Sequence, residues 1–197
     1  VLYLGFFQSI PEFTAKYGWW LLYLNISVVS LGAGVWHITA YKTKITCMVG
    51  MMLGMTLGMQ TGMMLGAVIG ATNGFFIGAM VGMLSGVLIG SIAGKCCGIM
   101  GVMEGMMAGL MGGTMGPMIT LMMFSDNILI FMPFYIAVNV VILAGLSYML
   151  IEEVVENKKN IVKQPLDFWT FLSVCILVTL ALMFLMIYGP KSAFVSF

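Results

Sequence analysis

The chain has 197 residues, of which 61% are hydrophobic and only 8% are charged. Soluble domains carry about 25% charged residues, so this composition excludes a soluble protein and predicts an integral membrane protein in contact with the lipid bilayer. The formal net charge is +1 and all eight basic residues are lysine, which argues against nucleic acid as a partner.

Apolar segments long enough to cross a bilayer follow one another along the chain. A spanning helix needs about 20 residues. The segment 1–18 is expected to lie in the membrane interface, because its apolar run is short and is ended by Pro11 and Glu12. We predict an all-α polytopic helix bundle, a single membrane domain with six spans and one charged loop, 152–165. The spans are expected at about 19–39, 45–71, 75–94, 98–124, 128–151 and 166–188.

Glycine recurs at every fourth residue from Gly50 to Gly98, and a second series runs from Gly101 to Gly113. A single helix over the first series would be about 72 Å long, more than twice the thickness of a bilayer core. The series must therefore fold at the polar Thr72-Asn73-Gly74. Because small residues let helices approach closely in lipid, spans two to four are predicted to form a glycine-zipper core of GxxxG repeats, in one chain or between subunits. The packing positions are Gly54, Gly58, Gly62, Gly66, Gly78, Gly82, Gly86, Gly90, Gly105 and Gly109.

Methionine, present 22 times, keeps the same four-residue step beside the glycines. One interpretation is packing, since methionine fills irregular gaps. The other is a ladder for a soft ion such as Cu(I), since thioethers are soft, neutral ligands. Spans one and six hold none and two of the methionines, a clustering that favours the ladder. Its members would be Met51, Met55, Met59 and Met63, followed by Met103, Met107, Met111 and Met115.

Three of the four cysteines fall at one end of the methionine-rich spans: Cys47, Cys96 and Cys97. They could receive the ion, because thiolates bind Cu(I) more strongly than thioethers do. The alternative for each is a small buried apolar residue.

Glu104 is the only acid clearly within a span. An intramembrane carboxylate marks a functional site or is paired with a polar group. We expect an electrostatic waypoint for the ion, or a protonated acid bonded inside the bundle. The candidate partners are Gln60, Asn25, Asn139, Lys95 and a bound cation.

Orientation follows from the lysines. With six spans, six lysines lie on one side and two on the other, which puts the first side in the cytoplasm and both termini outside. We expect a bacterial cytoplasmic membrane. The chain has one histidine, no P-loop and no nucleophile elbow, so we predict that it is not an enzyme.

The run GIMGVMEGMMAGLMGGTMGPMITLMMF, from Gly98 to Phe124, resembles poorly characterised Gly/Met-rich bacterial membrane proteins. The likeness covers Thr46 to Phe124, and it implies copper or heavy-metal handling. It departs from the CTR-type copper permeases, which have three spans and a soluble Met-rich amino end.

Together these features predict a membrane permease or binding protein for a soft monovalent metal ion, Cu(I), with the thioether ladder leading to cytoplasmic thiols. The alternative is a structural or accessory subunit whose glycine zipper drives self-assembly, as a homo-oligomer, or packing in a larger membrane complex. A third possibility is an oligomeric channel for other ions, with an axial path and rings of Glu104.

Overall fold

The computed structural model describes residues 13–40, 46–123, 126–156 and 168–190. Nearly all residues in these ranges are helical and none lies in a strand, as predicted. Six α-helices follow one another, with one short 3-10 turn between the third and the fourth. They are α1 (Phe13–Ala40), α2 (Cys47–Asn73), α3 (Phe75–Gly94), η2 (Lys95–Cys97), α4 (Gly98–Met122), α5 (Ile128–Glu156) and α6 (Phe168–Tyr188).

Two helices extend beyond the predicted spans. The first helix begins at Phe13, so it includes the last residues of the segment predicted to be interfacial, while its candidate membrane span begins at Gly18. The fifth helix continues through the acidic residues to Glu156, so the predicted charged loop begins too early. Acidic side chains at a helix end can reach water without ending the helix. The rest of that loop and the first twelve residues lie outside the described residues.

Five stretches of the described chain are long and apolar enough to cross a membrane. The third, Phe75–Met122, has 48 residues and contains both α3 and α4. With 20 residues, α3 alone is about 30 Å long, the thickness of a bilayer core. The protein is an integral membrane protein, and six helices form its bundle.

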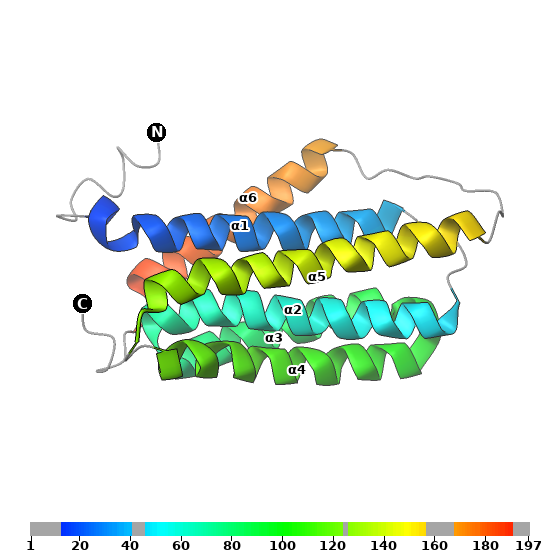
Figure 1. The fold of residues 1–197 in the computed structure, drawn as a ribbon, viewed down its shortest axis with the longest axis horizontal. Helices are drawn as coiled ribbons and strands as arrows, with labels where there is room; N and C mark the ends of the chain where they lie inside the picture. The colour runs from blue at the N-terminus through cyan, green and yellow to red at the C-terminus, as the bar shows by residue number, and fades with distance from the viewer. Residues whose placement is uncertain (1–12, 41–45, 124–125, 157–167, 191–197) are drawn as a thin grey trace.

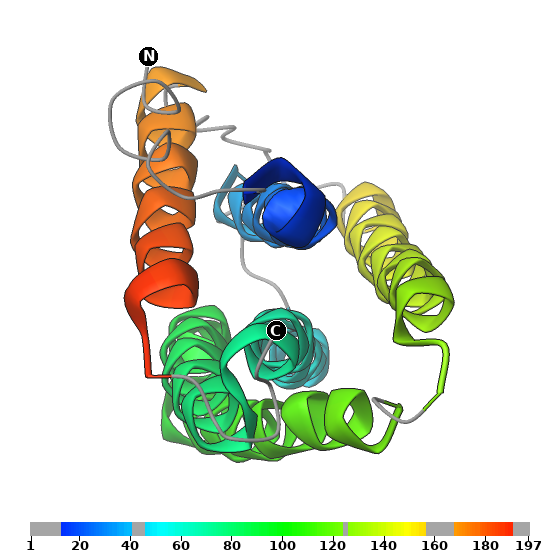
Figure 2. The same cartoon turned by 90° about the vertical axis from the view of Figure 1, so that its left-hand side faces the viewer.

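The second helix lies at the centre of the molecule. Its most apolar window is 72% buried, whereas that of α6 is 6% buried. Figures 1 and 2 show α2, α3 and α4 packed together, with α1, α5 and α6 arranged around the other side of α2. The buried side chains that join the two groups include Leu24, Leu57 and Met132.

The turn between α2 and α3 is the predicted fold in the glycine series. The second helix ends at Asn73, and Gly74 has a φ of 105°, in the region that side-chain-bearing residues avoid. The Gly74 amide donates to the Gly70 carbonyl at 3.0 Å, and the Gly78 amide donates to the Gly74 carbonyl at 3.1 Å. A single residue thus reverses the chain, and α3 runs antiparallel to α2.

Candidate functional site

Helices α2, α3 and α4 touch through glycines, one from each helix at each level. A Cβ atom placed on Gly54 would lie 2.9 Å from the Gly94 Cα and 3.4 Å from the Gly101 carbonyl oxygen. One turn further along α2, a Cβ on Gly58 would lie 2.7 Å from the Gly105 oxygen and 3.1 Å from the Gly90 Cα. The separations of 2.7 and 2.9 Å are shorter than real Cβ contacts, so main chain packs directly on main chain.

The same pattern repeats along the helices. A Cβ on Gly86 would lie 2.9 Å from both the Gly109 Cα and the Gly58 oxygen, and Gly82 meets Gly113 in the same way. At the last level Pro117 replaces the α4 glycine, 2.8 Å from the Cβ position of Gly70. The four-residue step continues unbroken through the turn at Gly74. Glycines that are equally far from Gly74 on α2 and on α3 therefore face each other, as Gly70 and Gly78 do.

All ten glycines predicted as packing positions are buried in this three-helix contact. Their partners are in the same chain. Along the line where the glycines meet, the main chains leave no space for the axial path that a zipper-lined channel needs. A surface for another subunit must therefore come from other side chains.

The thiols lie at the end of the bundle where α2 begins and η2 connects α3 to α4. The Cys97 Sγ donates a hydrogen bond to the Cys47 carbonyl, and the Cys96 Sγ donates to the Ala93 carbonyl at 3.2 Å. A Cβ on Gly50 would lie 2.7 Å from the Cys96 Sγ and 2.8 Å from the Cys97 Sγ. Both vicinal sulfurs therefore lie over the first turn of α2, where glycine leaves room for them.

Burial, and then the neighbouring Cys47 and Cys96 thiols, together raise the pKa of the Cys97 thiol to about 11. The thiol is consequently protonated at neutral pH, and a metal would have to displace its proton. Within the described ranges, no three His, Cys, Asp or Glu side chains are grouped so as to hold a metal ion. Thioethers would have to complete a site here. Met51 lies one turn after Cys47 on the same face of α2.

The methionine row of α2 runs beside the main chain of α4. A Cβ on Gly112 would lie 2.9 Å from the Met59 Cα, and a Cβ on Gly116 would lie 3.0 Å from the Met63 Cα. The two helices are therefore parallel. Two turns earlier along each helix lie Glu104 of α4 and Met51 of α2, so this register places the acid at the level where the row begins.

Glu104 itself is half-buried. No hydrogen bond or ion pair of its carboxyl group is found within the part of the chain that the structure describes. Two of the predicted partners bond to their own helices: Asn25 donates to the Leu21 carbonyl at 2.8 Å, and Asn139 donates to the Tyr135 carbonyl at 2.7 Å. A third, Gln60, has a buried side-chain oxygen without a hydrogen-bond partner among the described residues. Neither Asn25 nor Asn139 is therefore the partner of the Glu104 carboxyl group.

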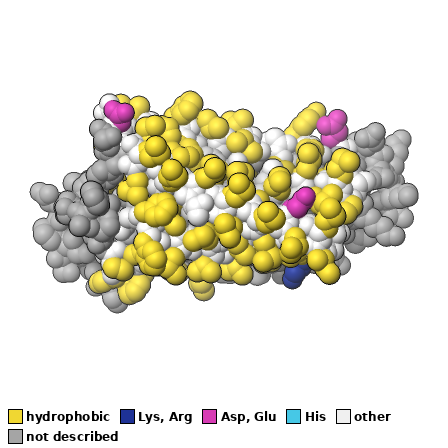
Figure 3. Space-filling view, turned by 90° about the horizontal axis from the view of Figure 1, so that it is seen from below, with side chains coloured by type: hydrophobic (Ala, Val, Ile, Leu, Met, Phe, Trp, Pro, Cys, Tyr) yellow, Lys and Arg dark blue, Asp and Glu magenta, His cyan; other side chains and the backbone are white. Residues whose placement is uncertain are grey.

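The methionine row of α4 lies on the outside of the bundle. Its four members, Met103, Met107, Met111 and Met115, are between 44% and 66% exposed. Figure 3 shows how densely hydrophobic side chains cover this lower surface of the molecule. In α2, Met55 is also exposed, whereas Met51, Met59 and Met63 are partly buried. One chain therefore does not enclose the two rows in a common interior channel.

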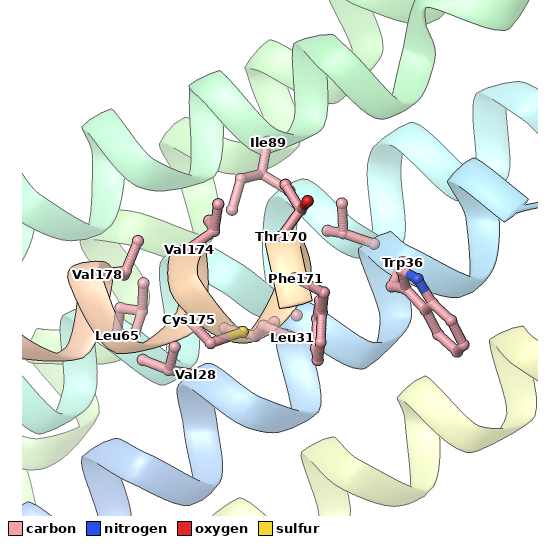
Figure 4. A pocket seen from close by; sticks show the side chains of 12 residues that line it. Val28, Leu31, Trp36, Leu65, Ile89, Thr170, Phe171, Val174, Cys175 and Val178 are labelled. Atoms are coloured by element: carbon pink, nitrogen blue, oxygen red, sulfur yellow. The ribbon is translucent and has the colours of Figure 1, made fainter. Parts of the chain in front are cut away.

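Sequence reasoning missed an apolar cavity of about 320 Å³ between α1 and α6 (Figure 4). Gly32 forms part of its wall, and a Cβ there would lie 2.9 Å from the Cys175 Sγ. At one end the rings of Trp36 and Phe171 lie 5.9 Å apart. In the sequence, the only indication of this cavity was a pair of small residues, Gly32 in the first span and Cys175 in the last. The lining is almost entirely hydrocarbon and suits an apolar chain better than an ion.

Comparisons with protein-family models, with curated proteins and with solved structures found no match for this chain.

Proposed function

We propose that the protein is a permease or binding protein for a soft monovalent metal ion, and that this ion is Cu(I). The observation that carries the proposal is the meeting of Cys47, Cys96 and Cys97 at the end of the bundle where the methionine rows of α2 and α4 begin. Sulfur is the preferred donor for Cu(I).

Each group would have a distinct role. The thioethers of Met51, Met55, Met59 and Met63 would bind the ion without proton exchange, as neutral ligands one helical turn apart. Glu104, placed in register with Met51, would offset the positive charge of the ion in hydrocarbon. The thiols would then hold it more tightly as thiolates.

The direction of movement is part of the proposal. The helix end that carries η2 is opposite the start of α1 and the end of α6 (Figure 1). We assign the η2 end to the cytoplasm of a bacterial membrane, which leaves both termini outside, because the lysine count favours it. Among the lysines, only Lys95 has a described side chain; it lies at this end and is exposed. Ions would then move from thioether to thiolate, inward and towards stronger ligands.

The test is Cu(I) binding by the purified protein, measured by competition with a chromophoric Cu(I) chelator. The variant C47S/C96S/C97S is expected to lose the tightest site, and M51L/M55L/M59L/M63L is expected to bind fewer ions. The matched control M80L/M83L/M132L/M149L replaces four methionines outside both rows and should bind as the unaltered protein does. Equal binding by all four proteins, or no binding by any, would refute the proposal.

The second candidate is an accessory subunit of a membrane complex. One observation favours it: the exposed methionines of α4 form a surface that nothing in the described chain covers. The glycine stripe, which the sequence suggested for contacts between subunits, makes its contacts inside the chain instead. Partners that co-purify with the protein, are insensitive to the Cu(I)-binding variants and are lost on changing the exposed α4 side chains would favour this function.

A further inference from the structure

The first residue of α2 and the last residue of η2 contact each other through their thiols. The Cys97 Sγ donates a hydrogen bond to the Cys47 carbonyl oxygen, and the Cys47 Sγ lies 4.0 Å from the Cys97 carbonyl oxygen. The two thiols are also within hydrogen-bonding reach of each other. Because each sulfur lies against the main chain of the other residue, the two side chains point towards each other. Two cysteines that are 50 positions apart in the chain thus have neighbouring sulfur atoms.

The third thiol at this end of the bundle is placed differently. Cys96 donates to the Ala93 carbonyl at 3.2 Å, within its own segment. The Cα atoms of adjacent residues are about 3.8 Å apart across a trans peptide bond, whereas disulfides join residues whose Cα atoms are about 4.4–6.8 Å apart. A bond between Cys96 and Cys97 would therefore be strained. Cys47 and Cys97 belong to different segments and do not have this restriction.

Reagents dissolved in water can reach the pair. Cys47 is exposed and Cys97 is partly exposed, and the neighbouring Lys95 is exposed as well. Cys175, by contrast, lies against Gly32 in the wall between α1 and α6. Thiol–disulfide exchange depends on access to the attacking thiol. Of the two paired cysteines, Cys47 is therefore the one that reacts first.

We propose that Cys47 and Cys97 are a redox-active pair that forms a reversible disulfide, and that this bond closes the thiol end of the protein to Cu(I). The inference rests on the proposed function for the ion, but not for the disulfide. The oxidant is a low-molecular-weight disulfide such as oxidised glutathione.

The exchange takes place in two steps. Cys47 releases its proton to water, and its thiolate attacks one sulfur of the small disulfide, which forms a mixed disulfide and releases one small thiolate. Cys97 then releases its proton, attacks the Cys47 sulfur and displaces the second small thiolate. The two small thiolates take up the two protons. Two protein thiols are thus oxidised by two electrons while one small disulfide is reduced to two thiols.

The consequence for the ion is a loss of ligands. Cu(I) is held by thiolates, and the sulfurs of a disulfide carry no thiolate charge. With Cys47 and Cys97 joined, Cys96 is the one thiol left of the three. In the proposed orientation this end faces the cytoplasm, where reducing conditions keep thiols free. The site is then open in the reduced cell and closes on oxidation.

The disulfide is tested without metal on the purified protein. After treatment with oxidised glutathione, free thiols are alkylated with a maleimide under denaturing conditions and counted by intact mass. Two of the four cysteines should escape alkylation and carry no glutathione. This loss should persist in C96S and C175S and be absent from C47S and C97S. Four alkylated cysteines in the native protein, or a loss that persists in C47S or C97S, would overturn the pair.

The closure is tested separately by chelator competition for Cu(I) with the oxidised and reduced forms of the protein. The oxidised form is expected to lose the tightest site and to regain it on reduction, and the matched control C175S should respond in the same way. Equal Cu(I) affinity of the two forms would overturn the closure while leaving the disulfide. A disulfide that forms in a protein whose reduced form binds no Cu(I) would instead refute the proposed function.

Discussion

The glycine contact predicts that one added methyl group will loosen the three-helix unit. In G86A, the new Cβ would lie 2.9 Å from three main-chain atoms: the Cα and the carbonyl oxygen of Gly109, and the carbonyl oxygen of Gly58. Main-chain atoms cannot turn aside as a flexible side chain can. All three neighbours belong to other helices, so α3 has to move away from both of them.

The size of the effect follows from those distances. Ordinary contacts of a Cβ atom begin near 3.4 Å, so α3 must shift by roughly half an ångström over one turn. Overpacking of this kind costs about 1–3 kcal/mol. The gain in helix propensity on replacing glycine with alanine offsets at most about 1 kcal/mol of it. We therefore expect G86A to lower the free energy of unfolding by about 1–2 kcal/mol.

The chain offers a matched control in Gly145 of α5, where a Cβ would meet nothing within 4 Å. G145A makes the same chemical change without the contact, so it should be neutral or slightly stabilising. Both variants can be unfolded in detergent micelles by titration with a denaturing detergent and followed by circular dichroism. If G86A were as stable as G145A, the close approach of the three main chains would be refuted.

Three further predictions concern the thiols and the end of α6. Because the Cys97 thiol has a pKa raised to about 11, Cu(I) must displace its proton, so apparent affinity should rise with pH between 6 and 9, by up to about tenfold per unit for each proton released. C97S should flatten this dependence in chelator competition. N73A removes a 3.0 Å hydrogen bond to the main chain of α6 and should cost about 1–3 kcal/mol. N25A, which removes only a bond within α1, should cost less; equal losses in the unfolding titration would contradict the difference. Finally, a membrane-impermeant maleimide should label exposed Cys47 from the cytoplasmic side and label Cys175, inside the α1–α6 wall, far more slowly. Labelling of Cys47 only from the outer side would reverse the proposed orientation.

Much of the fold could be predicted from residue spacing and helix length. The glycine series is too long for one span, and Thr72-Asn73-Gly74 is the polar, turn-forming spot near its middle, so the hairpin followed from length and from this turn. The start of α1 at Phe13 was less accessible, since the mixed polar and aromatic residues after the proline fit a helix and an interfacial segment equally well.

The direction in which the side chains point could not be predicted in the same way. Nearly every residue of α2 and α4 is apolar, so no polar face distinguishes the inside of the bundle from the outside. Glycine and methionine keep the same step on both helices. Yet the α4 row lies on the surface, whereas Met59 of α2 lies beside the main chain of α4. Only the packing of the helices decides which stripe is buried.

The central claim is that sulfur atoms of this chain bind Cu(I), and the most direct measurement is X-ray absorption at the copper edge on Cu(I)-loaded protein in detergent. We predict two or three sulfur neighbours at about 2.3 Å, the length of a metal–thiolate bond. We also predict a loss of the thiolate contribution in C47S/C96S/C97S. A first shell made of oxygen or nitrogen, or a protein that retains no copper after removal of loosely bound ions, would contradict the claim.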